Sequence, residues 1–187
     1  MEQDMERTQE HLPKPGEDRR PKQGKKRSRQ PGAARRKEAQ AKVPDKDVRI
    51  TIHSSQIIGG TLLEGAELVT WGTYAYGKDR ISFSYMESEL TGLDGTRTIF
   101  HILPDEVVLS RSGSVNSQMI FHPGKLNNFL YDTAYGILQM GLDTRRLECA
   151  LDEHGGSMEI EYELDFERNL VSRNTFKIHV EEQELKS

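Results

Sequence analysis

The chain has 187 residues, with 26 Lys and Arg against 30 Asp and Glu, which gives a net charge of −4. Its single Cys excludes a disulfide framework and any zinc site built on Cys. No stretch approaches the roughly 18 consecutive apolar residues of a membrane-spanning helix. The first residues lack the apolar core of a secretory signal, so we expect a soluble, cytoplasmic protein that does not act at a membrane.

Residues 1–46 differ in composition from the rest of the chain. They carry 14 basic and 8 acidic residues, five of the seven prolines and no aromatic residue. Such a segment cannot bury enough apolar surface to offset the entropy lost on ordering it. We therefore expect 1–46 to form a disordered basic tail. Residues 47–187 are numerous enough to build one substantial core and are expected to form one folded domain.

The segment 47–187 shows the two-residue period of β-strands. From Met158 to Phe166, apolar residues at even positions alternate with acidic residues at odd positions. One apolar face and one solvated face are typical of antiparallel sheets. Similar, shorter alternations occur at 48–52, 81–85, 107–109, 147–151 and 176–180.

Short turns rich in Gly, Pro and Asp separate these segments. We predict an all-β fold, an antiparallel up-and-down barrel of about eight to ten strands. A sandwich is the alternative, but successive hairpins close most simply into a barrel. Only Leu126–Tyr131 has the character of a helical turn.

The last two strands can be aligned from their pattern alone. Their apolar residues are even-numbered on both strands, so the numbers of paired residues must add up to an even value. One register places Lys177 opposite Glu163 and leaves a five-residue connection at 168–172. The other places Lys177 opposite Glu161, and each register also gives Arg173 an acidic partner. Both alternatives stay open at this point.

Several stretches carry a family resemblance. They are Val107–Gly113, Met119–Gly124, Tyr131–Gly136, Leu151–Gly156, Ile160–Tyr162 and Asn174. Together they resemble the YwiB-like family of uncharacterised bacterial proteins, over essentially 47–187 and not over the tail. The resemblance implies a calycin-like, lipocalin-type β-barrel in a bacterial cytoplasm. It brings no established activity and no catalytic residues.

Arg111 is the most informative residue for function. It is in phase with Val107 and Leu109, which are expected to point into the barrel. A small barrel can hold one ligand, and an inward Arg can bind a carboxylate or phosphate through two hydrogen bonds. The alternative is that Arg111 ends its strand in solvent or pairs with an internal acid. The other candidates for lining such a cavity are Arg145, Tyr74, Tyr76, Tyr131 and Tyr135.

No motif indicates a reaction. The six His residues are scattered without metal-ligand spacing, and neither a phosphate-binding loop nor a nucleophile elbow is present in the sequence. Cys149 is in phase with Leu147 and Leu151 and is expected in the core, where a thiol behaves as a small apolar group. We expect no metal and no cofactor. The first functional hypothesis is a non-enzymatic module that binds a small ligand or a protein partner.

The basic tail supports a second hypothesis, an accessory RNA-binding or ribonucleoprotein role. Between residues 19 and 37 there are ten basic residues and no acidic one. Such a segment can neutralise phosphates without reading sequence, although an incidental, solubilising tail is the alternative. The candidate nucleic-acid-binding residues are Arg19, Arg20, Lys22, Lys25, Lys26, Arg27, Arg29, Arg35, Arg36 and Lys37.

Overall fold

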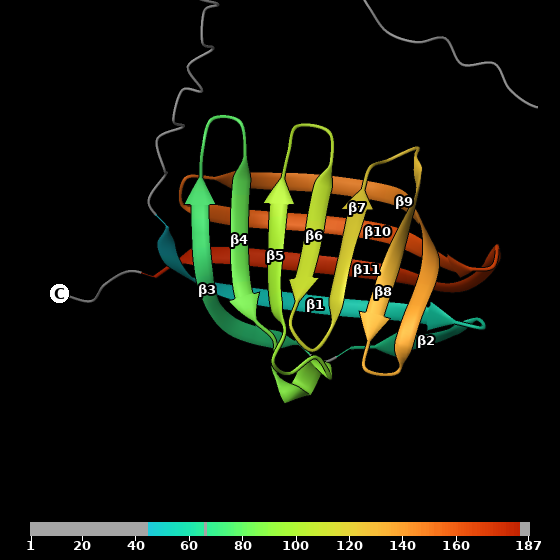
Figure 1. The fold of residues 1–187 in the computed structure, drawn as a ribbon. Coiled ribbons are helices and arrows are strands. Elements are labelled where there is room, and N and C mark those ends of the chain that lie inside the picture. The colour runs from blue at the N-terminus through green and yellow to red at the C-terminus, as the bar shows by residue number, and fades with distance from the viewer. Residues whose placement is uncertain (1–44, 66, 184–187) are drawn as a thin grey trace, which may run out of the picture. The chain divides into compact units, whose positions relative to one another are not determined.

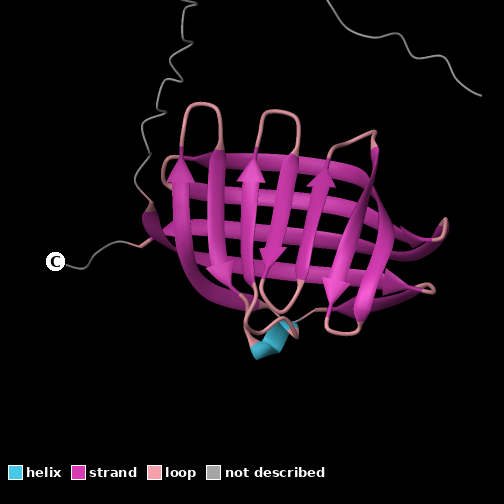
Figure 2. Ribbon diagram, viewed as in Figure 1, coloured by secondary structure: helices cyan, strands magenta, loops and turns pink. Residues whose placement is uncertain are grey.

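The computed structural model describes residues 45–65 and 67–183, and the basic tail therefore lies outside the described residues. The described part is built from eleven strands and one short 3-10 helix. The strands are β1 (Lys46–Ile58), β2 (Thr61–Glu64), β3 (Leu68–Tyr76), β4 (Ile81–Met86), β5 (Arg97–Ile102), β6 (Val107–Ser112), β7 (Asn116–Phe121), β8 (Leu126–Thr133), β9 (Gly136–Asp152), β10 (Gly155–Phe166) and β11 (Asn169–Glu182). The helical turn η1 (Glu89–Thr91) lies at the lower rim in Figure 2.

All pairings between these strands are antiparallel, and nearly all join neighbours in the sequence. Each strand from β3 to β11 pairs with the next, and β1 pairs with β3 because β2 folds back on β1 as a hairpin. The barrel closes through β1 and β11, which pair over ten positions from Val48–Glu182 to Ile57–Arg173. The predicted up-and-down barrel is thus confirmed, with ten strands in the wall and β2 as an addition. No helix in the described part is long and apolar enough to cross a membrane.

Alternation within the strands fills the interior. Val48, Ile50 and Ile52 of β1 are buried, as are Met158 and Ile160 of β10, while the residues between them face outward. Inside the barrel, Phe83 stacks on Phe100 with 4.7 Å between ring centroids, and Tyr162 meets Phe121 edge-on. Burial of one face of every strand is the main source of stability expected for such a wall.

The barrel wall consists of a front layer and a back layer, and it bends sharply at the two corners where one layer continues into the other. Strands β3 to β8 and the first part of β9 run upright at the front in Figure 1, whereas the rest of β9 crosses behind them with β10, β11 and β1. Gly72 lies at one corner, where β3 is still paired with β1 and begins to pair with β4. A side chain at Gly72 would collide with the carbonyl of Ser84 and with Ile50. At the other corner, β9 bends at a bulge that leaves Arg145 without a partner on β10.

The register of the last hairpin differs from both predicted alternatives. Lys177 lies opposite Glu159, and Arg173 lies opposite Glu163. The connection between the two strands is shorter than predicted, because the chain reverses in a tight turn at Glu167 and Arg168, both with positive φ. A bulge beyond Leu164 absorbs one extra residue of β11. Positive φ normally favours Gly or Asn, so the sequence contains no signal for this turn.

Two further predictions are wrong in detail. Leu126–Tyr131, the candidate helical turn, is the body of β8, because Phe129 of this segment is buried when the segment pairs with β9. Cys149 lies opposite Met158 and so on the inner face, but it is exposed. Of the described strands, only β10 pairs with residues 146–152 of β9, so this edge is not covered. Partial burial raises the pKa of the Cys149 thiol, which disfavours the thiolate.

Candidate binding site inside the barrel

A cavity of about 290 Å³ lies inside the barrel near its lower rim. Gly65, Glu67 and Leu68 flank it on one side, and Leu90 and Leu93, from η1 and the loop that follows, flank it on the other. Deeper inside, the wall combines apolar with polar side chains. These are Ile52, Phe100, Phe176 and Ile178 together with Ser54, Tyr85, Glu87 and Arg111.

A second hollow of about 290 Å³ adjoins the first and shares Ser54, Gly65 and Phe176 with it. Tyr162 and Asn174 contribute to its lining. The two hollows together form a space within the barrel end that is apolar over most of its wall, which is the usual character of a small-molecule site.

Polar side chains form a row across the front layer at the level of this cavity. Cross-strand pairing places Tyr85 opposite Thr98, Thr98 opposite Arg111, Arg111 opposite Ser117, and Ser117 opposite Tyr131. Directly opposed residues share a face of the sheet, so all five point inward. Five neighbouring polar positions on the inner face of a mainly apolar barrel are unusual, because each must find a partner or remain unsatisfied.

Arg111 is the charged member of this row. Only 14% of its side chain is exposed, and its Nε is buried without a hydrogen-bond partner in the described structure. Its nearest ionic partner is Glu87, whose Oε1 lies 3.9 Å from Nε and whose side chain is 2% exposed. The Thr98 hydroxyl donates a hydrogen bond of 2.6 Å to the same Oε1. The guanidinium is therefore held near a carboxylate but is not hydrogen-bonded to it.

The phenols beside Arg111 stay protonated. Burial raises the pKa of Tyr85, and the negative charge of Glu87 raises it further. Burial also raises the pKa of Tyr162, although the nearby charge of Arg111 partly opposes the shift. Both groups are neutral hydroxyls at physiological pH and can donate or accept hydrogen bonds. The cavity thus offers several donors around one buried ion pair.

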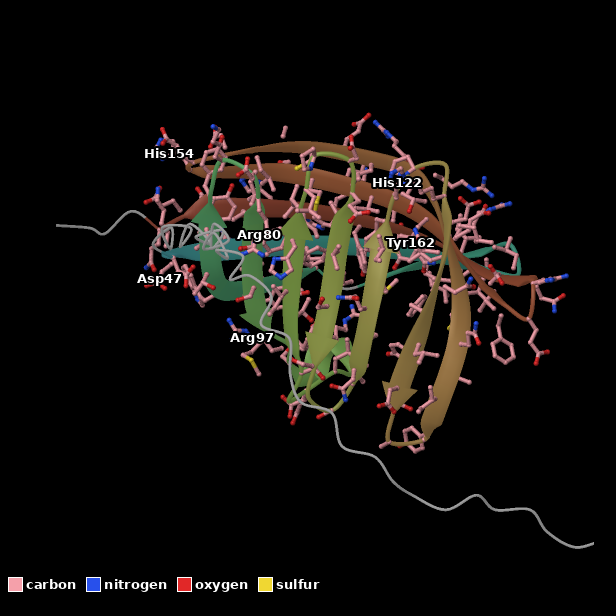
Figure 3. All side chains as sticks on the ribbon, turned by 45° about the horizontal axis from the view of Figure 1, so that its top comes forward. Asp47, Arg80, Arg97, His122, His154 and Tyr162 are labelled. Atoms are coloured by element: carbon pink, nitrogen blue, oxygen red, sulfur yellow. The ribbon has the colours of Figure 1, made fainter. Side chains whose placement is uncertain are left out.

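The other predicted cavity residues do not gather around Arg111. Tyr131 is the exception in part, since it lies on the inner face two strands away and is half-buried. Tyr74 is buried, and its hydroxyl donates a hydrogen bond to the backbone carbonyl of Asp152. That carbonyl belongs to the end of the barrel marked by Asp47 and His154 in Figure 3, with Tyr162 farther along the barrel.

Tyr76 and Tyr135 are exposed, at 42% and 102% respectively, with Tyr135 in the turn between β8 and β9. Neither lines the cavity, because Tyr76 ends its strand and Tyr135 lies beyond the paired region.

Arg145 points outward, contrary to the prediction from its phase with Leu147. The bulge in β9 falls at Arg145 itself, so counting by twos across it assigns the wrong face. Its guanidinium bonds Glu163, which also accepts a 2.8 Å hydrogen bond from Arg173. These two hydrogen bonds lower the pKa of Glu163. Arg145 is thus part of the solvent-exposed ionic surface.

Glu87, Tyr85 and Tyr162 are the cavity residues that sequence reasoning missed. Glu87 continues the alternation of Phe83 and Tyr85, which would have placed it on the inner face. It lies one residue beyond the end of β4, where a strand pattern gives no reason to extend the count. The ten basic candidate residues between 19 and 37 lie outside the described residues.

The outer face of the back layer carries a larger but shallower hollow of about 390 Å³. Its lining includes the exposed Lys177 and the half-buried Glu159, which pair at 3.5 Å, and Ser157 and His179, which hydrogen-bond at 3.0 Å. These groups already have partners and solvent, so the hollow lacks a buried group that a ligand would satisfy. The interior cavity is the stronger candidate.

The fold and its interior cavity define a closed β-barrel protein. A family model described as a domain of unknown function, DUF1934, matches residues 50–178. The match spans more than half of the chain, and the chain belongs to this family. A similar curated protein is the uncharacterized β-barrel protein YwiB of Bacillus subtilis strain 168. It is 28% identical over 116 residues, which are 62% of this chain and 80% of YwiB.

The crystal structure of YwiB from Bacillus subtilis is similar in fold. The TM-score is 0.61 at 22% sequence identity, over 75% of this chain and 94% of that chain. The predicted YwiB-like resemblance and the barrel fold are therefore confirmed.

The buried ion pair predicts unequal effects of single and double substitutions. Arg111→Met leaves Glu87 charged and buried, so we expect the free energy of unfolding to fall by about 3–5 kcal/mol. Combining it with Glu87→Gln removes both charges, and we expect the double variant to be at least about 1 kcal/mol more stable than the sum of the single losses predicts. Urea unfolding of the unaltered protein, the two single variants and the double variant measures these differences in the free energy of unfolding. Losses that add within error would show that the two side chains do not interact.

Proposed function

We propose that this protein is a non-enzymatic binding module that takes a small organic molecule into the lower end of its barrel. The observation that carries the proposal is a nearly buried guanidinium, with an unpartnered Nε, on the wall of an accessible and mainly apolar cavity. A buried donor without a partner costs free energy, and a ligand that accepts its hydrogen bond recovers that cost. Arg111 anchors the polar end of the ligand, and the apolar walls hold its body.

Access to the cavity supports the same proposal. Leu68, at the mouth, lines the cavity, whereas its neighbour Val69 points outward and is 45% exposed. Part of the mouth is formed by the connection between β2 and β3 and by a helical turn, so a ligand can enter there without breaking the ladder of hydrogen bonds. Binding sites in barrel mouths commonly have this arrangement.

Because Leu68 points into the cavity and Val69 points outward, the two positions provide a matched pair of variants. Leu68→Trp fills the cavity, and we expect it to weaken binding of the uncharged fluorophore N-phenylnaphthylamine by about tenfold or more, which corresponds to ~1.4 kcal/mol. Val69→Trp adds the same side chain on the outside and is expected to bind like the unaltered protein. Fluorescence titration of the full chain measures both. Equal binding by the two variants would place the probe outside the barrel and contradict the proposal.

A second candidate function is RNA contact through the tail, which the charge of residues 19–37 supports. The segment 47–187 has 12 basic and 22 acidic residues, so it repels phosphates and leaves the tail as the source of affinity. In this proposal the barrel and the tail act as separate modules.

The RNA proposal predicts a strong dependence on salt. We expect the full-length chain to bind a single-stranded RNA oligonucleotide, with log affinity falling by about 0.7 per neutralised phosphate for each tenfold increase in salt. Replacing the six basic residues at 25–27 and 35–37 with Gln is expected to weaken binding and flatten this slope. A filter-binding titration over a series of salt concentrations measures both. Binding that survives the replacements unchanged would refute the role of the tail.

A further inference from the structure

The charges around the cavity do not favour an anion. Among the described residues that line the two hollows, Arg111 is the one basic side chain, whereas Glu67 and Glu87 are both acidic. With one cation and two carboxylates, the lining has a net charge of −1. Glu87 is almost fully buried, so solvent screens its charge weakly. A carboxylate or phosphate placed beside Arg111 would therefore be attracted by one group and repelled by another at a similar depth.

The hydrogen-bonding groups point to a different kind of head group. None of the hydrogen bonds between described side chains uses the Arg111 guanidinium, whose five N–H donors include the buried, unpartnered Nε. Ser117, opposite Arg111 on β7, also has a buried hydroxyl without a partner. Glu87 accepts a hydrogen bond from Thr98, and a carboxylate has further acceptor sites. Unused donors and an acceptor thus lie side by side.

A cationic head group fits this arrangement poorly. An ammonium group has only donors, and it would meet the guanidinium, which also has only donors and the same charge. A head group that combines an acceptor with a donor, and that carries no net charge, can satisfy Arg111 and Glu87 together. It leaves the buried ion pair electrically balanced, which a charged head group would disturb.

We propose that the ligand is an uncharged amphipathic molecule with an amide-like head group, whose carbonyl accepts from Arg111 and whose N–H donates to Glu87. This inference rests on the proposed binding function and specifies its ligand. The apolar body of the molecule lies along Ile52, Phe100, Phe176 and Ile178. Anions and cations with the same apolar body bind more weakly.

Three probes that differ only in the head group test this directly. The full-length chain is titrated calorimetrically with octanamide, octanoate and octylamine at neutral pH. We expect octanamide to bind about tenfold or more tightly than either charged probe. Octanoate or octylamine binding as tightly as octanamide overturns the inference while leaving the binding function intact. If N-phenylnaphthylamine binds in the cavity but octanamide does not, the inference also fails. If none of the four probes binds, the proposed function itself fails.

Glu87→Gln tests the electrostatic reason for the preference. The substitution keeps the shape of the side chain and removes one buried negative charge, so we expect octanoate affinity to rise by about tenfold and that of octanamide to change much less. Glu153→Gln is the control, because Glu153 is 71% exposed and does not line the cavity. If Glu87→Gln does not fold, Glu67→Gln at the exposed mouth should raise octanoate affinity by a smaller factor, about threefold. Unchanged octanoate affinity in the folded variant contradicts the inference.

Discussion

The pairing of β1 with β11 is the interaction on which the rest of the barrel depends. It joins the first and last strands of the wall over ten positions, and without it the sheet would expose two long unpaired edges. The same pairing fixes the phase of both strands, so that Ile50 faces Val180 and Ile52 faces Ile178 inside the barrel. Closure also demands two corners, which Gly72 and the bulge at Arg145 provide. The interior cavity is a consequence of this geometry.

The cavity holds the charged pair Arg111 and Glu87 within a mainly apolar interior. Arg111 and Glu87 lie 3.9 Å apart with little solvent, and a buried pair of this kind contributes little net stability on its own. Phe83 and Phe100 show that the barrel can pack its interior with stacked aromatic rings. An apolar pair in place of the ion pair would therefore be compatible with the fold. The unpartnered hydrogen-bond donors at this position are the basis of the proposed ligand recognition.

The alternation of apolar and polar residues predicts the barrel fold and the inward position of Arg111. It fails where a bulge or the end of a strand interrupts the two-residue period. Arg111 was placed by its phase with Leu109, because β6 is regular from end to end. Arg145 was misplaced because the bulge in β9 falls at that residue, and no Gly or Pro marks it. Glu87 lies just beyond the end of β4. Cys149 lies in the part of β9 that pairs with β10 but not with β8, so its exposure depends on how the strands pair. These features arise from tertiary pairing and have no local signal.

In the proposed function, the space beside Arg111 is a binding site. Two-dimensional NMR of the isotopically labelled full-length chain during titration with octanamide tests it most directly. We expect saturable shifts of the Arg111 Nε–H signal together with the amides of Phe100 and Ile178, which line the cavity. Shifts confined to the outer hollow, at His53 and Lys177, or an unchanged Arg111 signal at saturation, would contradict it.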